Sequence, residues 1–276
     1  MNTYGLCGSI SVHLRSSAVC RNQSYATTKS VRTRNIMPNS EEKSNSYVKH
    51  PKFSISVVIP TVNEEETVAP IIEGCIPYAD EIIVVDGHSC DRTREIAEGL
   101  AVKVILDHKK GKGEALRHST KHVSGDIIVF IDADGSHDPE DIPKLVEPIL
   151  RNEADHVSGS RLIGGSSELH GGFDECFRLM GSSFITACIN WKFKVRLSES
   201  QNGFRAIRTD VIRQLELREN ITTIEQEMII KTLKKGFRMG EVPSHEHKRM
   251  GGYSKISLKK VWFRYVYTLV KYLFLS

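Results

Sequence analysis

Two aspartates at the end of one strongly apolar stretch constrain the fold more than any other feature of the sequence. Residues 127–139 read IIVFIDADGSHDP, so an apolar run passes directly into Asp132 and Asp134 before a glycine and a proline break the chain. Such an unbroken run is typical of a strand buried on both faces, the usual state of a central parallel strand. Open α/β sheets bind ligands outside the carboxyl ends of their strands. The stretch therefore predicts an α/β fold with a polar site at this strand end.

The spacing of the two aspartates points to a metal ion. Residues i and i+2 of an extended chain point the same way, so Asp132 and Asp134 converge while Ala133 points away. Two carboxylates this close raise each other's pKa unless a cation lies between them. A hard divalent ion that also bridges to a phosphate meets that need. The alternative is a simple turn, in which Asp134 and the next glycine supply only turn chemistry.

Strands and helices alternate along the first half of the ordered chain. We expect strands at residues 54–60, 81–86, 102–106 and 126–131, with helices at 65–75, 91–100 and 113–123 between them. This alternation predicts a doubly wound, mostly parallel sheet flanked by helices.

Neither of two common nucleotide-binding loops is present in the sequence. The turn after the first strand reads TVNEEE instead of G-x-G-x-x-G, and GKG at 111–113 lacks the hydroxyl residue and the preceding strand of a P-loop. Polar groups instead end successive strands: Asn63 and Glu64, then Asp86, then the two aspartates. This row suits the N–H groups of a base, the ribose hydroxyls and a metal, in that order.

Charge is unevenly distributed behind a net value of +4. Residues 1–40 sum to +5, residues 41–160 to −10 and residues 161–276 to +9. We interpret this as one part that holds a metal and another that meets anions, with chance variation on solvated faces as the alternative. Nucleic-acid binding is disfavoured, because residues 41–276 sum to −1 and no basic patch interleaved with aromatic residues occurs outside the tail.

Residues 1–50 are predicted to be a disordered arm. They are rich in Ser, Thr, Asn and Arg, and no acid precedes Glu41. The bias resembles an organellar transit peptide, whereas a polar arm without function, or an upstream mis-assigned start, is the alternative. The six cysteines are scattered without a C-x-x-C pair, which argues against a zinc knuckle or a disulfide framework and favours a reducing compartment.

Several motifs together resemble one enzyme family. SVVIPTVNEE, EIIVVDGHSCDRT, GKGEALR and GDIIVFIDADGSHDP are similar to the amino-terminal half of family 2 glycosyltransferases with the GT-A fold. The later segments VSGSRLIGG, ESQNGFRAIR, IEQE, GEVP and KRMGGYSKIS resemble the dolichyl-phosphate mannosyltransferase branch. The resemblance covers about residues 54–260 and implies a GT-A glycosyltransferase domain over residues 51–260.

The resemblance also implies roles for the matching residues. The nucleotide-sugar-binding residues would be Pro60, Asn63, Glu64, Asp86, Lys112, Asp132, Ala133, Arg249 and Lys255. Asp132 and Asp134 would hold Mg²⁺ or Mn²⁺ on the diphosphate, and the catalytic residues would be Asp134, Glu199 and Arg249. Gly87 and Glu199 depart from the family pattern, since many relatives carry Asp at both positions.

The second half supplies cations for an acceptor. A strand at 155–160 delivers Arg161, a helix at 174–191 carries Arg178, and in the resemblance both grip the phosphate of a lipid. A guanidinium group can bind phosphate through two parallel N–H donors. For each of the two arginines, a surface salt bridge is the alternative. A helix is expected at 222–235, where Glu225 and Glu227 do not share a face and therefore act as caps or salt-bridge partners.

The tail, residues 261–276, is expected to form an amphipathic interfacial helix. Fifteen helical residues span about 22 Å, short of the roughly 30 Å hydrocarbon core of a bilayer. We therefore expect the helix to lie on a membrane surface with Trp262, Tyr265 and Tyr272 at the headgroups. A helix packed on the body or in a dimer interface is the alternative.

The resemblance implies an inverting transferase that moves a sugar, with mannose from GDP-mannose as the first expectation, to a dolichyl or polyprenyl phosphate. It would work as a peripheral protein on the cytoplasmic face of a membrane, or in an organelle if residues 1–50 are a transit peptide. Three alternatives stay open: a UDP-glucose-dependent enzyme of the same kind, a relative with a soluble saccharide acceptor, and a nucleotide-binding membrane adaptor. The soluble acceptor would require a general base at Glu199, because a sugar hydroxyl must lose its proton and a phosphate monoester is already largely ionised.

Overall fold

The computed structural model describes residues 52–167, 173–249 and 258–275, with the main chain alone at 173–178 and 258–262. The predicted arm of residues 1–50 and Lys255 lie outside the described residues.

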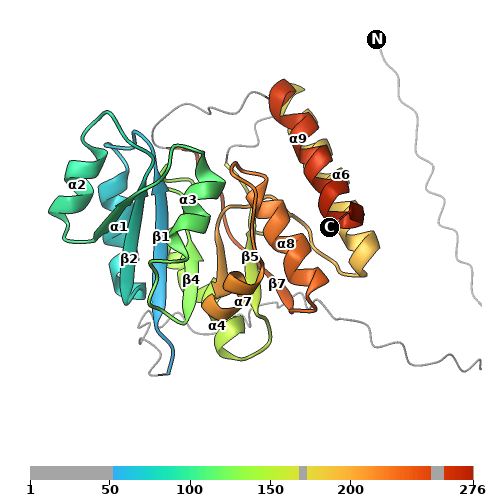
Figure 1. The fold of residues 1–276 in the computed structure, drawn as a ribbon, viewed down its shortest axis with the longest axis horizontal. Helices are drawn as coiled ribbons and strands as arrows, with labels where there is room; N and C mark the ends of the chain where they lie inside the picture. The colour runs from blue at the N-terminus through green and yellow to red at the C-terminus, as the bar shows by residue number, and fades with distance from the viewer. Residues whose placement is uncertain (1–51, 168–172, 250–257, 276) are drawn as a thin grey trace, which may run out of the picture. The chain divides into compact units, whose positions relative to one another are not determined.

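The described residues form one seven-stranded sheet in the order β3-β2-β1-β4-β6-β5-β7 (Figure 1). The strands are β1 (Ile55–Thr61), β2 (Glu81–Asp86), β3 (Lys103–Leu106), β4 (Ile127–Phe130), β5 (His156–Ser160), β6 (Arg205–Arg208) and β7 (Met239–Pro243). Neighbouring strands run parallel except that β6 is antiparallel to both β4 and β5. The predicted mostly parallel α/β sheet is therefore confirmed.

Helices connect and cover the strands. They are α1 (Val68–Cys75), η1 (Ile76–Tyr78), α2 (Thr93–Gly99), α3 (Lys112–Ser119), η2 (Pro139–Asp141), α4 (Ile142–Leu150), α5 (Arg161–Gly164), α6 (Phe173–Phe193), α7 (Thr209–Gln214), α8 (Ile224–Lys234), α9 (Leu258–Val270) and the π-helical η3 (Lys271–Leu275). The helices expected in the first half are present, each slightly shorter than predicted.

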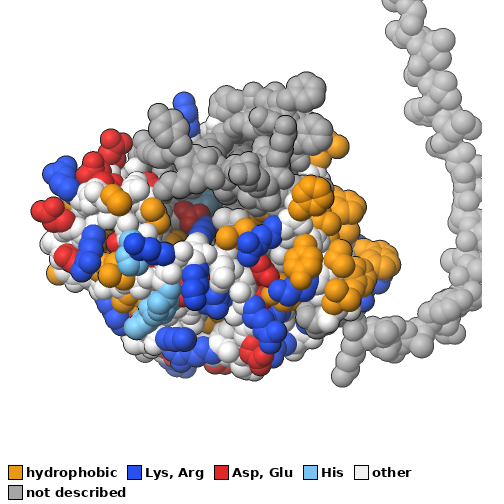
Figure 2. Space-filling model, turned by 45° about the horizontal axis from the view of Figure 1, so that its top comes forward, with side chains coloured by type: hydrophobic (Ala, Val, Ile, Leu, Met, Phe, Trp, Pro, Cys, Tyr) orange, Lys and Arg blue, Asp and Glu red, His pale blue; other side chains and the backbone are white. Residues whose placement is uncertain are grey.

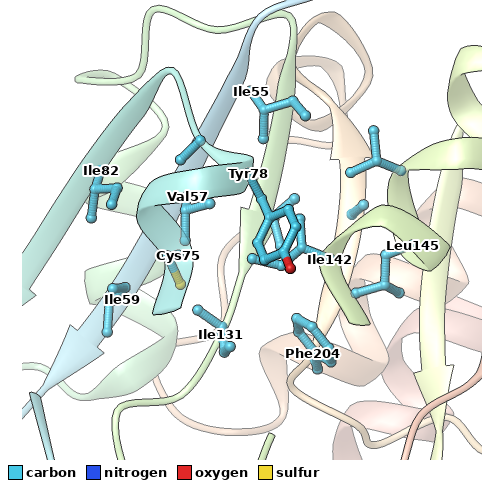
Figure 3. Packing of buried hydrophobic residues seen from close by; sticks show 14 of the residues in the cluster. Ile55, Val57, Ile59, Cys75, Tyr78, Ile82, Ile131, Ile142, Leu145 and Phe204 are labelled. Atoms are coloured by element: carbon cyan, nitrogen blue, oxygen red, sulfur yellow. The ribbon is translucent and has the colours of Figure 1, made fainter. Parts of the chain in front are cut away.

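Alternating residues of the central strands build a core on each side of the sheet. Ile55 and Val57 of β1 pack with the apolar sides of α1 and α4, where Figure 3 shows Cys75 and Leu145 approaching the strand residues. Val58 points the other way, into a second core with α3, α7 and α8. Burial on both faces explains the unbroken apolar runs of the sequence, since neither side of the sheet faces water.

A third core joins α6, α8 and α9, and Figure 1 shows α6 and α9 side by side. Tyr272 contributes to this core at 1% exposure, and its hydroxyl donates to Glu219 at 3.1 Å. The Tyr265 hydroxyl donates to Thr222 at 2.7 Å. The prediction that these two tyrosines lie at the headgroups is therefore wrong, because both side chains point inward and their hydroxyls donate to protein oxygens. The side chain of Trp262 lies outside the description.

The opposite side of the two helices is apolar and exposed. The exposed residues include Met180, Phe184 and Trp191 of α6 and Phe263, Tyr267 and Phe274 of the tail. Figure 2 shows apolar side chains gathered on this side of the molecule. Within the described part of the chain, none of the helices has the length and apolar character needed to cross a bilayer.

The second half contains elements that the sequence analysis did not specify. These are α4, which carries Pro148 in its last turn, the short α7, and β7 at the sheet edge. The fifth strand, expected at 155–160 with Arg161 at its end, is present as β5 and α5 begins at that arginine.

Candidate active site

The first of two adjoining cavities lies where the parallel strands end. Register places Thr61 of β1 opposite Asp86 of β2, and Asp86 opposite Leu106 of β3, so the segments that follow these strands meet at one edge. The cavity has a volume of about 440 Å³. Its lining includes Pro60, Gly87, Asp107, Lys109, Lys112 and Asp132. This is the predicted position for a nucleotide, at the carboxyl edge of the sheet.

A second cavity, of about 130 Å³, shares Lys112 and Asp132 with the first. Its other walls come from the second half of the chain and include Arg161, Glu199 and Arg249. The structure therefore brings Asp132 into one region with Arg161 and Arg249 of the second half.

Lys112 joins the two halves of the site. It stands at the first position of α3, and its ammonium lies 2.8 Å from the Asp132 carboxylate and 2.9 Å from Glu225 of α8. Burial alone would lower the pKa of Lys112, but the two carboxylates outweigh burial and raise it above its ordinary value. A Cβ at Gly203 would lie 2.8 Å from both Lys112 Nζ and Asp132 Oδ2, so only glycine leaves this ion pair undisturbed.

Asp132 and Asp134 are the candidate ligands for a metal. Burial favours the neutral form of Asp132, yet the Lys112 ammonium outweighs it and lowers the pKa of that carboxyl. Asp134 lies 3.3 Å from Arg249 Nε, and its Oδ1 accepts a hydrogen bond from Ser136 N at 3.0 Å. Two carboxylates two residues apart, each paired here with a cation, suit a hard divalent ion in their donor chemistry. The residues present therefore fit Mg²⁺ or Mn²⁺.

Arg161 is held between two buried carboxylates at the end of β5. Its Nε donates to Glu199 at 2.6 Å, its main-chain N–H donates to the same carboxylate at 3.2 Å, and Nη1 bonds Glu246. Burial raises the pKa of Glu199 although Arg161 opposes the shift, whereas the pKa of Glu246 is lowered because Arg161 and Ser166 outweigh its burial. The guanidinium is thus fixed in orientation towards the second cavity.

The predicted nucleotide residues Asn63, Glu64 and Asp86 lie near the ends of β1 and β2 but are not among the residues that line the first cavity. Asp86 accepts hydrogen bonds from Ser89, and Asn63 Oδ1 accepts one from Cys90 N at 2.7 Å. Glu64 begins the turn into α1 and receives a bond from Thr67. Ala133 packs in the core at 2% exposure and lines neither cavity, so the structure does not place this predicted nucleotide residue in the site.

Two predicted residues have no described side chain. Arg178 lies on α6, where the main chain alone is described, and Lys255 lies outside the described residues. Their predicted contacts with phosphate stay predictions. Glu225 and Glu227 are salt-bridge partners as expected, of Lys112 and Lys231 respectively.

Sequence analysis missed two polar residues that line the second cavity. The ring of His137 stacks on Phe204 with centroids 5.1 Å apart, and its buried Nδ1 has no hydrogen-bond partner among the described residues. Burial lowers the pKa of His137 despite the neighbouring aspartates. The buried Nδ2 of Asn202 likewise has no partner within the described part of the chain. In the sequence, His137 follows the aspartates and Asn202 lies inside the QNGFR motif, and these positions were the available signal. Both residues matter to the site because unpaired buried polar atoms require a ligand or water.

Comparisons with known proteins agree with this arrangement. The model of the family described as Glycosyl transferase family 2 matches residues 56–217. The dolichol-phosphate mannosyltransferase of Pyrococcus furiosus is 34% identical over 231 residues, which cover 80% of this chain and 64% of that protein. The glycosyltransferase AglJ of Haloferax volcanii is 28% identical over 204 residues, covering 72% of this chain and 65% of that one. The chain thus spans just under two thirds of the length of these relatives.

Solved structures resemble the fold. The glucosyl-3-phosphoglycerate synthase from Mycobacterium tuberculosis, crystallised with Mn²⁺, uridine diphosphate and phosphoglyceric acid, matches with a TM-score of 0.65 and 24% identity. The match covers 82% of this chain and 80% of that one. At this level of identity the likeness establishes a shared fold.

Proposed function

Since the chain belongs to glycosyl transferase family 2, we propose that it transfers a hexose, with inversion, from a nucleotide sugar to a dolichyl or other polyprenyl phosphate. Mannose from GDP-mannose is the proposed donor, in keeping with the mannosyltransferase among the relatives. The observation that carries the proposal is that two cavities share Lys112 and Asp132: one lies at the strand ends, and the other contains Arg161.

The donor occupies the first cavity in this proposal. Its base lies against the ends of β1 and β2, and its diphosphate reaches the shared wall at Lys112. A divalent ion held by Asp132 and Asp134 would neutralise charge that develops on the departing diphosphate. Lys112 and Arg249 lie 2.8 Å and 3.3 Å from those aspartates and add positive charge at the same point.

The acceptor phosphate enters the second cavity and attacks the anomeric carbon. A bond forms between a phosphate oxygen and that carbon, and the bond from the carbon to the diphosphate breaks with its electrons leaving on the diphosphate. A phosphate monoester, with a second pKa of about 6, needs no base to become a nucleophile. The Arg161 guanidinium carries five N–H donors, and Glu199 and Glu246 engage three of its nitrogens, which leaves donors for the phosphate.

A membrane surface supplies the lipid acceptor in this proposal. The exposed aromatic residues of α6 and α9 would enter the headgroup region, with the protein peripheral on the cytoplasmic face. Phe263 is 79% exposed and Trp191 66%, and Lys194 lies 5.7 Å from the Trp191 ring. Aromatic rings beside cationic groups are typical of helices that lie in a membrane interface.

The proposal is tested with a panel of nucleotide sugars and a short polyprenyl phosphate, with and without EDTA. We expect a lipid-linked product with GDP-mannose that EDTA abolishes and added Mg²⁺ or Mn²⁺ restores. The variant Asp134→Asn should lose at least a hundredfold in rate, whereas the matched change Asp138→Asn should not, because Asp138 Oδ1 only accepts from Glu140 N at the start of η2.

The panel also separates the alternatives. Product from UDP-glucose alone would replace the proposed donor. Product on a soluble saccharide, with none on the lipid phosphate, would replace the proposed acceptor. Donor binding without turnover on any acceptor would make the protein a nucleotide-binding adaptor.

A further inference from the structure

A cluster of histidines next to the first cavity has no part in the reaction proposed above. His108 follows β3, Glu114 and His118 lie one turn apart on α3, and the metal-ligating atoms of these three residues all lie within 4.8 Å of one another. His122 adds a further ring whose centroid is 4.7 Å from that of His118. Figure 2 shows imidazole side chains close together at the surface.

We propose that His108, Glu114 and His118 form a binding site for a transition-metal ion, with Zn²⁺ as the best match. Two imidazoles and one carboxylate are a donor set that selects Zn²⁺, Ni²⁺ or Co²⁺ over Mg²⁺. Catalytic-type zinc sites use three protein ligands and leave one position open. His122 or water takes that fourth position.

The geometry requires only small side-chain adjustments. Zn–N and Zn–O bonds of about 2.0–2.2 Å place tetrahedral ligand atoms roughly 3.3 Å apart. His108 Nδ1 and Glu114 Oε1 are now 2.7 Å apart, and the rings of His108 and His118 are centred 4.6 Å apart in an edge-to-face arrangement. Ligands at i and i+4 of a helix share one face, so Glu114 and His118 converge without any change in α3.

The cluster is accessible on one side and anchored on the other. The His108 side chain is 58% exposed, which gives an ion a path of entry, while that of Glu114 is only 10% exposed. The second oxygen of Glu114 accepts a hydrogen bond from His108 N at 3.1 Å, which fixes the orientation of the carboxylate.

Binding would reinforce the wall of the first cavity. Asp107, Lys109 and Gly111 line that cavity, and His108 lies between them in the chain. An ion at the cluster would tie this segment to α3 and restrict the wall without touching the donor. The site is distinct from the aspartate pair, whose oxygen donors suit a hard ion.

Equilibrium dialysis of the full, tag-free chain with Zn²⁺ in a large excess of Mg²⁺ tests the proposal, because Mg²⁺ occupies the aspartate site. We expect one equivalent of Zn²⁺ to bind, and His108→Ala or His118→Ala to weaken binding at least about tenfold. His245→Ala is the matched control, because His245 also lies 4.7 Å from a second histidine ring yet belongs to a different loop. His108→Ala truncates an exposed side chain, so loss of binding in a variant with unchanged circular dichroism reports the ligand itself.

Two further measurements locate the ion. Co²⁺ should give visible ligand-field bands without a thiolate charge-transfer band, and Zn²⁺ should slow hydrogen exchange at residues 107–111 in the wild type but not in His118→Ala. The proposal fails if Zn²⁺ does not bind in the presence of Mg²⁺, if both histidine variants bind it unchanged, or if the cobalt spectrum shows a cysteine ligand.

Discussion

The substitution Glu199→Gln separates a positioning role from a general-base role. Glu199 is 2% exposed and receives two hydrogen bonds from Arg161, through Nε and the main-chain N–H. Glutamine is close in shape, and its carbonyl oxygen can still accept from the guanidinium. The substitution therefore removes the charge and the proton-accepting capacity while keeping the packing.

The two roles differ in magnitude. Replacing a charge-assisted hydrogen bond by a neutral one costs about 1–2 kcal/mol, a factor of roughly 5–30 in an equilibrium. Glu246 still pairs with Arg161, so the guanidinium keeps a buried counter-charge. Removal of a general base typically costs 10²–10⁴ in rate. We expect Glu199→Gln to lower kcat/KM for the lipid phosphate by no more than about thirtyfold, chiefly through KM.

Initial rates of lipid-linked product formation, measured against acceptor concentration from pH 6 to 8, decide between the roles. Under the positioning role the variant keeps the pH dependence of the wild type. A loss of a hundredfold or more in kcat, together with loss of the wild-type pH dependence, would refute the reasoning and show that the carboxylate takes a proton.

Three other predictions follow from the same structure. Lys112→Met should reduce kcat/KM at least about a hundredfold and lower the melting temperature, because it leaves two carboxylates without their shared cation. Lys110→Met, on the exposed loop before α3, should change neither quantity. Burial, aided by a nearby arginine, holds the pKa of His156 well below its ordinary value of 6.5, so the unfolded chain takes up the extra proton. The free energy of unfolding should then fall by about 1.4 kcal/mol per pH unit below pH 6.5. When this free energy is measured by urea titration at several pH values, its slope against pH should be smaller in His156→Gln by the contribution of one proton. Phe263→Ser should weaken binding to anionic vesicles about tenfold, as measured by co-sedimentation. Ile76→Ser, at a residue of η1 that is 51% exposed, should not weaken it. Equal vesicle binding by both variants would exclude α9 as the membrane contact.

The first half of the fold was predictable because its local and tertiary signals agree. The strands β1, β2 and β4 are apolar runs buried on both faces, and a polar break follows each of them. The second half was harder for a physical reason. β6 consists of Arg205–Arg208 and places a fully buried arginine in a central antiparallel strand, so hydropathy gives no strand signal there.

The site was predictable where chemistry is concentrated in adjacent residues. Asp132 and Asp134 could be placed from spacing alone, whereas their cationic partners come from α3 and from the loop after β7. Glu246 is a comparable case. It lies 85 residues after Arg161 in the chain, and only the bridge that pairs it with Ser166 brings it beside the guanidinium.

The inward turn of the tail tyrosines shows how a pattern can predict an element but not its orientation. The aromatic tail did predict a helix, yet Tyr272 lies beside Lys271 and Glu219 in a buried polar group, with Lys271 Nζ 3.0 Å from that carboxylate. A tyrosine hydroxyl seeks a hydrogen-bond partner either in the headgroups or in the protein. Sequence alone does not decide between these, because the competing acceptor lies more than fifty residues away in the chain.

The charge division of the sequence takes on a different meaning in three dimensions. The acidic and basic halves were expected to hold a metal and an anion separately, but the ion pairs cross between them: Lys112 with Glu225, and Arg249 with Asp134. Lys112, Arg161 and Arg249 face five carboxylates there, counting Asp134, so the site carries a surplus of negative charge before ligands bind. In the proposed reaction a divalent ion adds positive charge at the aspartates just as two phosphates bring negative charge to the same boundary. In the proposed reaction each cation can exchange a protein carboxylate for a phosphate oxygen, and the divalent ion would compensate the aspartates that are released. The same reasoning explains why Arg161 lies between two carboxylates while remaining the proposed anchor for the acceptor.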